Sequence, residues 1–368
     1  MRSISILCLL TSPILSVPSL HHVTLPSAIK QQKNDTRWRS ATLTHNHYTF
    51  IERGTSCTRE RQGWRNHTVF PPPQSAGPAL KMEPIIAPPS HVRIAPAPIV
   101  PPPGGLEVAV MTFNVRYDSG GDGAHAWRYR AAAVASVIQA SGVVVVGLQE
   151  VLWSQYLDLL RLLGDAWVGV FRGRNDGGEG EASGEAPAIV WKKDVLYSTA
   201  APYVFWFSPT PEVPGTMADG TSLPRACLQL HFIHLPSRRA FWMLNAHLDH
   251  TSPRARARST ELLLEKLPAG GKCDPVIVTG DFNAPPTEPS CIALRSELVD
   301  TVAAASAHEA TRGTFHGFAG GDPGEAARID YIYASSGVMV RRVQVIRDDV
   351  AGVLPSDHYP VAATLRWR

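Results

Sequence analysis

The chain has 368 residues, of which 44% are hydrophobic, so it is long enough to bury the core of one large domain or two ordinary ones. Its formal charge of +3 is unevenly distributed: residues 1–103 carry 11 Lys and Arg against 4 Asp and Glu, and residues 104–368 carry 24 against 28. A domain with net negative charge is poorly suited to grip long nucleic acid by broad neutralisation of phosphates, although it can contain a local basic pocket. No stretch reaches the roughly 18 consecutive apolar residues of a membrane-spanning helix, so no membrane span is expected.

The first 103 residues are expected to form a disordered extension outside the folded domain. They are rich in proline and keep neither helical nor strand periodicity for long. The opening residues combine a charge at Arg2 with a short apolar run that Pro13 interrupts. This pattern is compatible with a weak signal peptide, an organelle transit segment, or a start assigned upstream of a true start at Met82.

A cytoplasmic location is favoured, and an organelle or secretion would follow only if the opening residues are a targeting segment. Three of the five cysteines lie in residues 104–368, and none has metal-ligand spacing. An odd number argues against a disulfide framework and for a reducing compartment, and a thiolate zinc site is not expected.

Residues 104–368 read as one domain of strands and helices of ordinary length. In chain order, the expected strands are 108–115, 143–150, 188–191, 203–207, 226–233, 241–248, 276–283, 314–318, 329–333, 338–346 and 361–365. The expected helices are 126–139, 152–163 and 254–267, with Leu157, Leu160 and Leu163 on one face of the second, and a Gly- and Glu-rich loop is expected at 173–184. Many strands and few helices predict an α/β (α+β) fold, a four-layered sandwich of two packed, mostly antiparallel sheets flanked by helices.

The strand expected at 276–283 ends in the polar sequence Gly280-Asp281-Phe282-Asn283. At strand period two, Asp281 and Asn283 project to the same side, and Gly280 is expected where the backbone leaves the sheet. The two prolines that follow cannot continue a strand, because they lack the backbone donor. The chain therefore presents a carboxylate and an amide on a rigid strand end, as catalytic positions often do.

Other apolar runs also end in or contain a polar residue that a core strand would not favour. A lone carboxylate at a strand end is more often a helix cap or a solvated turn, and a lone histidine is more often a core or surface residue. Asp330 is harder to explain in this way, because a buried carboxylate between apolar neighbours needs a partner. Six such features in one domain predict a shared site: Asn114, Glu150, His247, Asp281 with Asn283, Asp330, and Asp357 with His358.

These side chains suit the hydrolysis of a phosphate ester. A hard cation, Mg²⁺ or Mn²⁺, takes oxygen ligands, which Glu150, Asn114 and Asp357 can supply. An aspartate beside the metal can deprotonate water, and imidazoles can donate to phosphoryl oxygens.

Residues 106–368 resemble the endonuclease/exonuclease/phosphatase superfamily, the DNase I-like group of metal-dependent enzymes that includes the nocturnin-like deadenylases. The resemblance is carried, in order, by Thr-Phe-Asn114, Leu-Gln-Glu150, Pro-Arg225, Asn-Ala-His247-Leu-Asp-His250, Gly-Asp281-Phe-Asn283, Ile-Asp330-Tyr-Ile and Ser-Asp357-His358-Tyr-Pro. Gly-Asp-Phe-Asn and Ser-Asp-His-Tyr-Pro are the most specific of these. The generic branch of the superfamily near the deadenylases fits best.

The resemblance implies a role for each matching residue at the metal and at the attacking water. Glu150 would ligate the metal, with Asn114 and Asp357 as further metal-site residues. Asp281 matches the residue that activates water, and Asn283 matches its hydrogen-bonding neighbour at the scissile phosphate.

The resemblance also assigns residues to the substrate phosphate. His247 and His358 match the two phosphate-side histidines, and Asp330 matches the carboxylate that orients His358. Arg225 and His250 would bind the substrate phosphate, with a structural salt bridge as the alternative for Arg225.

The expected activity is metal-dependent hydrolysis of a phosphodiester by in-line attack of water, as in a 3′–5′ RNA exonuclease acting on single-stranded RNA. One alternative is a phosphatase on a small phosphorylated metabolite or an inositol or lipid headgroup, which the negative charge of the domain favours. A catalytically dead binding module is a further alternative, and the occupied catalytic positions argue against it. The protein is expected to be a monomer.

Overall fold

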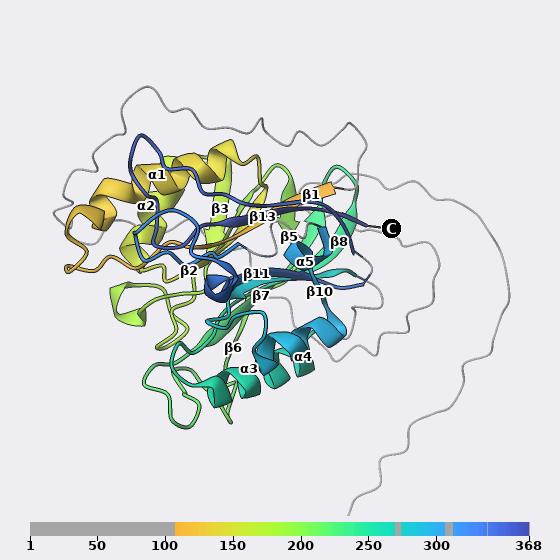
Figure 1. The fold of residues 1–368 in the computed structure, drawn as a ribbon. Helices are drawn as coiled ribbons and strands as arrows, with labels where there is room; N and C mark the ends of the chain where they lie inside the picture. The colour runs from red at the N-terminus through yellow and green to blue at the C-terminus, as the bar shows by residue number, and fades with distance from the viewer. Residues whose placement is uncertain (1–106, 269–273, 306–311, 337, 368) are drawn as a thin grey trace, which may run out of the picture. The chain divides into compact units, whose positions relative to one another are not determined.

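The computed structural model describes residues 107–268, 274–305, 312–336 and 338–367. The extension 1–103 and Cys273 lie outside these residues. Two sheets lie between two layers of helices, with α1 and α2 at the top of the view and α3 and α4 at the bottom (Figure 1). Across the described ranges, none of the helices has the length and apolar character needed to cross a membrane.

The first sheet has six strands in the order β12-β13-β1-β2-β4-β3. Its strands are β1 (Glu107–Asn114), β2 (Val145–Gln149), β3 (Trp167–Val170), β4 (Ile189–Lys192), β12 (Val338–Val345) and β13 (Val361–Trp367). The second sheet has seven strands along the path β10-β11-β9-β8-β7-β5, with β6 also paired to β7. Its strands are β5 (Leu196–Ser198), β6 (Tyr203–Trp206), β7 (Ala226–His234), β8 (Arg239–His247), β9 (Val276–Asp281), β10 (Val299–Asp300) and β11 (Asp330–Ala334).

The helices are α1 (Trp127–Ala140), α2 (Trp153–Leu163), α3 (Pro253–Glu265), α4 (Pro289–Glu297) and α5 (Thr301–Ala305). Short 3₁₀ helices lie at η1 (Gly123–His125), η2 (Glu181–Ser183) and η4 (Glu325–Ala327). Helix α3 begins with Ser252 as its N-cap, whose side chain accepts a hydrogen bond from the Ala255 N–H, and with a proline in its first turn.

Strand β1 is mostly apolar because both of its faces pack against other layers. Val108 and Val110 pack between the two sheets, whereas Met111 and Phe113 pack in the cluster that includes α1 and α2. Both faces of the strand are therefore buried, which removes the alternation of polar and apolar residues.

The second sheet is covered in the same way by α3 and α4. Leu263 of α3 and Leu294 of α4 pack with Val276 and Val278 of β9, while Ile277 points into the core between the sheets. Three apolar clusters thus separate four layers, which confirms the expected sandwich. Most strand pairs are antiparallel, with β1–β2 and β8–β9 as parallel pairs.

The two parallel pairs place polar residues at one edge of each sheet. Helix α1 connects β1 to β2, and α3 connects β8 to β9, as parallel neighbours require a crossover. The carboxyl ends of both strands in a parallel pair lie at the same edge, so Asn114 and Gln149 are register partners, as are His247 and Asp281.

A buried polar network joins the two sheets beneath these strand ends. Asn245 of β8 donates from Nδ2 to the carbonyls of Leu148 (2.8 Å) and Ala188 (2.9 Å) in the first sheet. Its Oδ1 accepts hydrogen bonds from Gln149 Nε2 (2.7 Å) and from Thr279 Oγ1 (3.0 Å). Asn245 therefore uses both ends of its amide, and the sheets meet at a fixed offset.

Several local expectations differ from the structure. In α2 the buried residues include Tyr156, Leu159 and Leu163, whereas Leu157 is 47% exposed. The expected leucine face was wrong because three residues spaced by three drift around a helix of 3.6 residues per turn. The segment 314–318 forms no strand and contributes only an isolated bridge between Phe315 and His358. Strands β3, β5 and β10 and helices α4 and α5 were not expected.

Gly280 was expected to mark the point where the backbone leaves the sheet, but strand β9 continues through Asp281. An added Cβ at Gly280 would collide with the carbonyl of Ala246 on the neighbouring strand β8. The glycine is therefore needed for close approach of two backbones inside the sheet.

Gly147→Ala is expected to lower the free energy of unfolding by about 2 kcal/mol, because it overpacks the contact between the sheets. The new Cβ would collide with the Thr279 hydroxyl and would lie 2.5 Å from Asn245 Oδ1. Urea unfolding measures the change. Gly120→Ala is the matched control, since a Cβ there meets nothing within 4 Å. Equal urea midpoints for the two variants would contradict the prediction.

Candidate active site

Strand register brings three of the expected site residues into one row. His247 of β8 lies opposite Asp281 of β9, and Asp281 lies opposite Asp330 of β11. All three are at least 90% buried. The row explains why these residues recur at strand ends that are far apart in the sequence.

Three residues at the site adopt a left-handed backbone conformation that only glycine adopts freely. The φ angles are 56° at Arg116, 60° at Glu150 and 50° at Asn283. Each follows the end of a strand by one or two positions. Such strain persists only where the surrounding contacts hold it, and it often occurs at functional sites.

Asn114 links the two halves of the site. Its Nδ2 donates to Glu150 Oε1 at 3.0 Å and to Asp281 Oδ2 at 2.9 Å. Its Oδ1 accepts the Arg116 N–H at 2.9 Å. In this arrangement the amide nitrogen of Asn114 faces the carboxylates, so the residue holds two acids at a fixed separation, and its expected role as an oxygen ligand stays a prediction.

Asp281 combines burial with a position suited to accepting a proton. Burial and then the neighbouring Asp330 carboxylate raise the pKa of Asp281 to about 7. Asp281 Oδ1 also accepts the Asn283 N–H at 2.9 Å, which links the two polar residues of the Gly-Asp-Phe-Asn sequence.

The two expected phosphate-side histidines have opposite electrostatic environments. Burial and then the nearby Arg225 lower the pKa of His247 well below its usual range, which favours the neutral ring. Burial would also lower the pKa of His358, but the Asp330 carboxylate, 2.9 Å from Nδ1, raises it to about 10. His358 is therefore a buried cation, and its Nε2 lies 3.9 Å from Asp281 Oδ2.

Asp357 lies beside His358 on a segment that a buried arginine holds. Arg130 of α1 donates to the carbonyls of His125, Val115, Arg116 and Pro355. Burial lowers the pKa of Arg130 to about 10, still well above neutrality. Arg130 thus ties the loop after β1 to the segment that carries Asp357.

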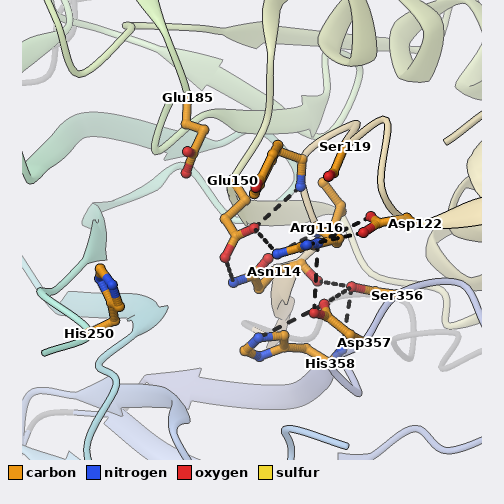
Figure 2. A network of polar contacts seen from close by, with 12 residues as sticks. Asn114, Arg116, Ser119, Asp122, Glu150, Glu185, His250, Ser356, Asp357 and His358 are labelled. Carbon is orange, nitrogen blue, oxygen red and sulfur yellow. Dashed lines mark hydrogen bonds and ion pairs between the residues drawn. The ribbon is translucent and has the colours of Figure 1, made fainter. Parts of the chain in front are cut away.

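The acidic residues suit a hard divalent cation. Carboxylate oxygens of Glu150 and Asp281 and a ring nitrogen of His247 all lie within 4.8 Å of one another. Asp357 adds a carboxylate on the other side of the Arg116 side chain, as Figure 2 shows. Because these donors are mostly oxygens, they fit Mg²⁺ or Mn²⁺ better than a thiolate-preferring metal.

The site opens into a cavity of about 610 Å³. Eight of the ten expected site residues line it: Glu150, Arg225, His247, His250, Asp281, Asn283, Asp357 and His358. The other two, Asn114 and Asp330, lie behind this lining and make hydrogen bonds to it. The structure therefore brings together all of the expected residues.

The cavity wall away from Asp357 carries an arginine–histidine contact and an ion pair. Arg225 is 5% exposed, and its Nη2 lies 3.0 Å from His250 Nδ1. Arg174 binds Glu185 through two contacts of 2.6 and 2.9 Å. Burial raises the pKa of Glu185, although Arg174 opposes the shift.

Sequence reasoning missed three charged residues of this cavity: Arg116, Arg174 and Glu185. Arg116 stands two positions after Asn114, a place that could have been noticed. Arg174 and Glu185 lie at the two ends of the Gly- and Glu-rich loop, where no periodicity marks them. Only the folded loop brings them to the site.

Asp330→Asn is expected to reduce the free energy of unfolding by about 3 kcal/mol below pH 6.5, because it breaks a buried ion pair. The pKa of His358 is raised in the folded state, so the pair stabilises fully below the unfolded value of about 6.5. The difference between wild type and variant should therefore shrink as the pH rises toward about 10. Urea unfolding at pH 6, 8 and 10 measures this trend, and a difference independent of pH would contradict it.

Comparisons with known proteins identify the family of the fold. A model of the Endonuclease/Exonuclease/phosphatase family matches residues 111–358. A crystal structure of a member of that family from Bacteroides thetaiotaomicron is 30% identical, with a TM-score of 0.65, and the match covers 72% of this chain and 99% of the other.

Two further similar structures come from proteins with different names, a phosphatase and nocturnin. A mannosyl-6-phosphatase from Bacteroides thetaiotaomicron is 30% identical, with a TM-score of 0.64, over 71% of this chain and 100% of the other. The catalytic domain of human nocturnin, with bound sulfate, is 20% identical, with a TM-score of 0.56, over 73% and 96%. The comparison with curated protein sequences gives no significant match. The chain belongs to the endonuclease/exonuclease/phosphatase family.

Proposed function

We propose that this protein is a metal-dependent phosphatase that hydrolyses a phosphate monoester of a small hydrophilic molecule. One observation carries the proposal: a buried carboxylate with a raised pKa, a histidine with a lowered pKa and a histidine with a raised pKa converge on one cavity with charged walls. Members of the family act on phosphate esters, and the 30% identical relative named above is a mannosyl-6-phosphatase.

The proposed chemistry assigns each side chain a task. Asp281 accepts the proton of the attacking water at a carboxylate oxygen, which its pKa of about 7 permits near neutral pH. Asn283 and His358 donate to the phosphate oxygens, where negative charge develops. A divalent cation at Glu150 supplies Lewis-acid charge when bound.

His247 is suited to a different task from His358. Its Nε2 lies 3.1 Å from Asn283 Nδ2 and 3.6 Å from Asp281 Oδ2. A neutral imidazole between these groups can orient the amide and donate one hydrogen bond without adding charge.

The cavity wall is suited to bind a small polar leaving group. Arg225, Arg174 and Glu185 offer donors and acceptors that match hydroxyl groups, and side-chain recognition of this kind needs no long basic surface. The negative charge of residues 104–368 points in the same direction, since it disfavours tracking of a nucleic-acid backbone.

A 3′–5′ RNA exonuclease is the second candidate. Tyr117 and Phe315 line the cavity, and Phe315 is 41% exposed, so an aromatic surface is available for a base to stack on. The nocturnin domain shares the fold at 20% identity, which supports the architecture and not the substrate.

A panel of a hexose 6-phosphate, p-nitrophenyl phosphate, bis(p-nitrophenyl) phosphate and oligo(A) separates the two candidates. The monoesters are expected to be hydrolysed at least tenfold faster, by kcat/KM, than the diester or oligo(A). Asp281→Asn should lower kcat on the best substrate by about 10³-fold, because it removes the proton acceptor. The exposed Asp165→Asn is the control and should retain wild-type activity. Faster cleavage of oligo(A) would favour the nuclease, and an active Asp281→Asn would refute the assigned base.

Metal binding is expected to stabilise the fold through Glu150. Millimolar Mg²⁺ or Mn²⁺ should raise the melting temperature, since a ligand that binds only the folded state stabilises it by mass action. Glu150→Gln should abolish most of this rise and the activity together, and chelation should abolish the activity of the wild type. Scanning calorimetry with and without the ion provides the measurement. A rise that Glu150→Gln leaves unchanged would place the cation elsewhere.

A further inference from the structure

Arg116 has a backbone that its surroundings hold in a strained conformation. Its φ of 56° lies in the left-handed region, which costs a non-glycine residue on the order of 1 kcal/mol. Its N–H is bound by Asn114 Oδ1, and its carbonyl accepts hydrogen bonds from Arg130 Nη2 and Gln155 Nε2, each at 2.9 Å. Glu150 and Asn283, two proposed active-site residues, also have positive φ angles.

The guanidinium of Arg116 is anchored on one side and open on the other. Asp122 accepts hydrogen bonds from Nε (3.2 Å) and Nη2 (3.1 Å). Nη1 makes no hydrogen bond within the described part of the chain and lies 3.9 Å from Glu150 Oε2. The side chain is 26% exposed and lines the cavity, so a bound molecule can reach the guanidinium.

This guanidinium also lies between the two carboxylates expected at the metal. It approaches Glu150 through Nη1 and Asp357 through Nε, at 3.9 Å in each case. Figure 2 shows Arg116 between Glu150 and the Asp357–His358 segment. A delocalised charge held at this position neutralises part of both carboxylates and repels a further cation nearby.

We propose that Arg116 is a catalytic residue that supplies the second positive charge of the site. Its guanidinium takes the place of a second divalent cation, so that a single ion at Glu150 completes the site, and Nη1 donates to the substrate phosphate. The donation from Nη1 to the phosphate rests on the proposed function. The claim that the site binds a single ion can be tested without a substrate.

Calorimetric titration with Mn²⁺ tests the charge without measuring activity. The wild type should bind one ion. Arg116→Gln should bind that ion about tenfold more tightly or take up a second one, because a repelling charge is lost. Arg116→Lys keeps the charge and should bind the ion within about twofold of the wild type. Arg161→Gln, at an exposed arginine of α2, is the matched control.

Titration with inorganic phosphate of the Mn²⁺-loaded protein tests the contact with the anion. Arg116→Gln should bind phosphate about tenfold more weakly, because it loses a charge-assisted hydrogen bond. The same variant should lower kcat on the best monoester by about 10²-fold, as expected for a group that faces developing charge. Arg116→Lys should recover part of the phosphate affinity and little of the rate, since its ammonium lacks the planar fork.

The outcomes separate this proposal from the proposed function. Two ions in the wild type, or an unchanged Mn²⁺ affinity and stoichiometry in Arg116→Gln, would overturn the fixed-charge role. Unchanged phosphate affinity would overturn the contact. A protein that hydrolyses none of the monoesters yet shows the expected Mn²⁺ shift would refute the phosphatase proposal and support the fixed charge. If Arg116→Gln melts too low to titrate, Arg116→Lys still tests the proposal. Binding of a second Mn²⁺ ion by Arg116→Lys would contradict it, because that variant keeps the positive charge.

Discussion

The side-chain amide of Asn245, buried between the sheets, determines where the active-site residues meet. It contacts the carbonyls of Leu148 and Ala188 and the side chains of Gln149 and Thr279, so both of its polar atoms are satisfied across the layer boundary. Apolar packing between sheets is non-directional and would tolerate a shift. A network of hydrogen bonds is directional and fixes one offset. The strand ends of the two sheets, one with Glu150 and the other with Asp281, face each other because of that offset.

Burial then sets the charges that these strand ends carry. The row contains a carboxylate whose pKa is raised, Asp281, and a histidine whose pKa is lowered, His247, and beside the row lies a histidine whose pKa is raised, His358. The difference between His247 and His358 comes from their neighbours, since Arg225 lies near the first and Asp330 binds the second. Two residues of one type thus acquire different tasks from their positions in the sheets. This is how a fold built from apolar strands produces a polar reaction site.

The sequence predicted most of this arrangement because its signals are local. Apolar runs that end in Asn114, Glu150 or Asp281 predict both the strands and the polar edge, and the sandwich follows from the number of strands. Arg174 and Glu185 were missed because a glycine-rich loop has no period from which an orientation can be derived. The buried face of α2 was misplaced because leucine spacing alone does not say which turn of a helix faces the core. The bond from Asn245 to Leu148 could not be predicted either, since nothing local specifies a partner 97 positions away.

Arg130 shows how an active site can depend on a residue that contacts no substrate. Its acceptors are main-chain carbonyls of His125, Val115, Arg116 and Pro355, which every residue type provides. Side chains at those four positions can therefore diverge without loss of the contact, whereas no other side chain carries five donors in a planar fork. Co-variation with those four positions is accordingly not expected, although one of these bonds holds the segment that carries Asp357. This part of the site is positioned by one side chain and by the path of the backbone around it.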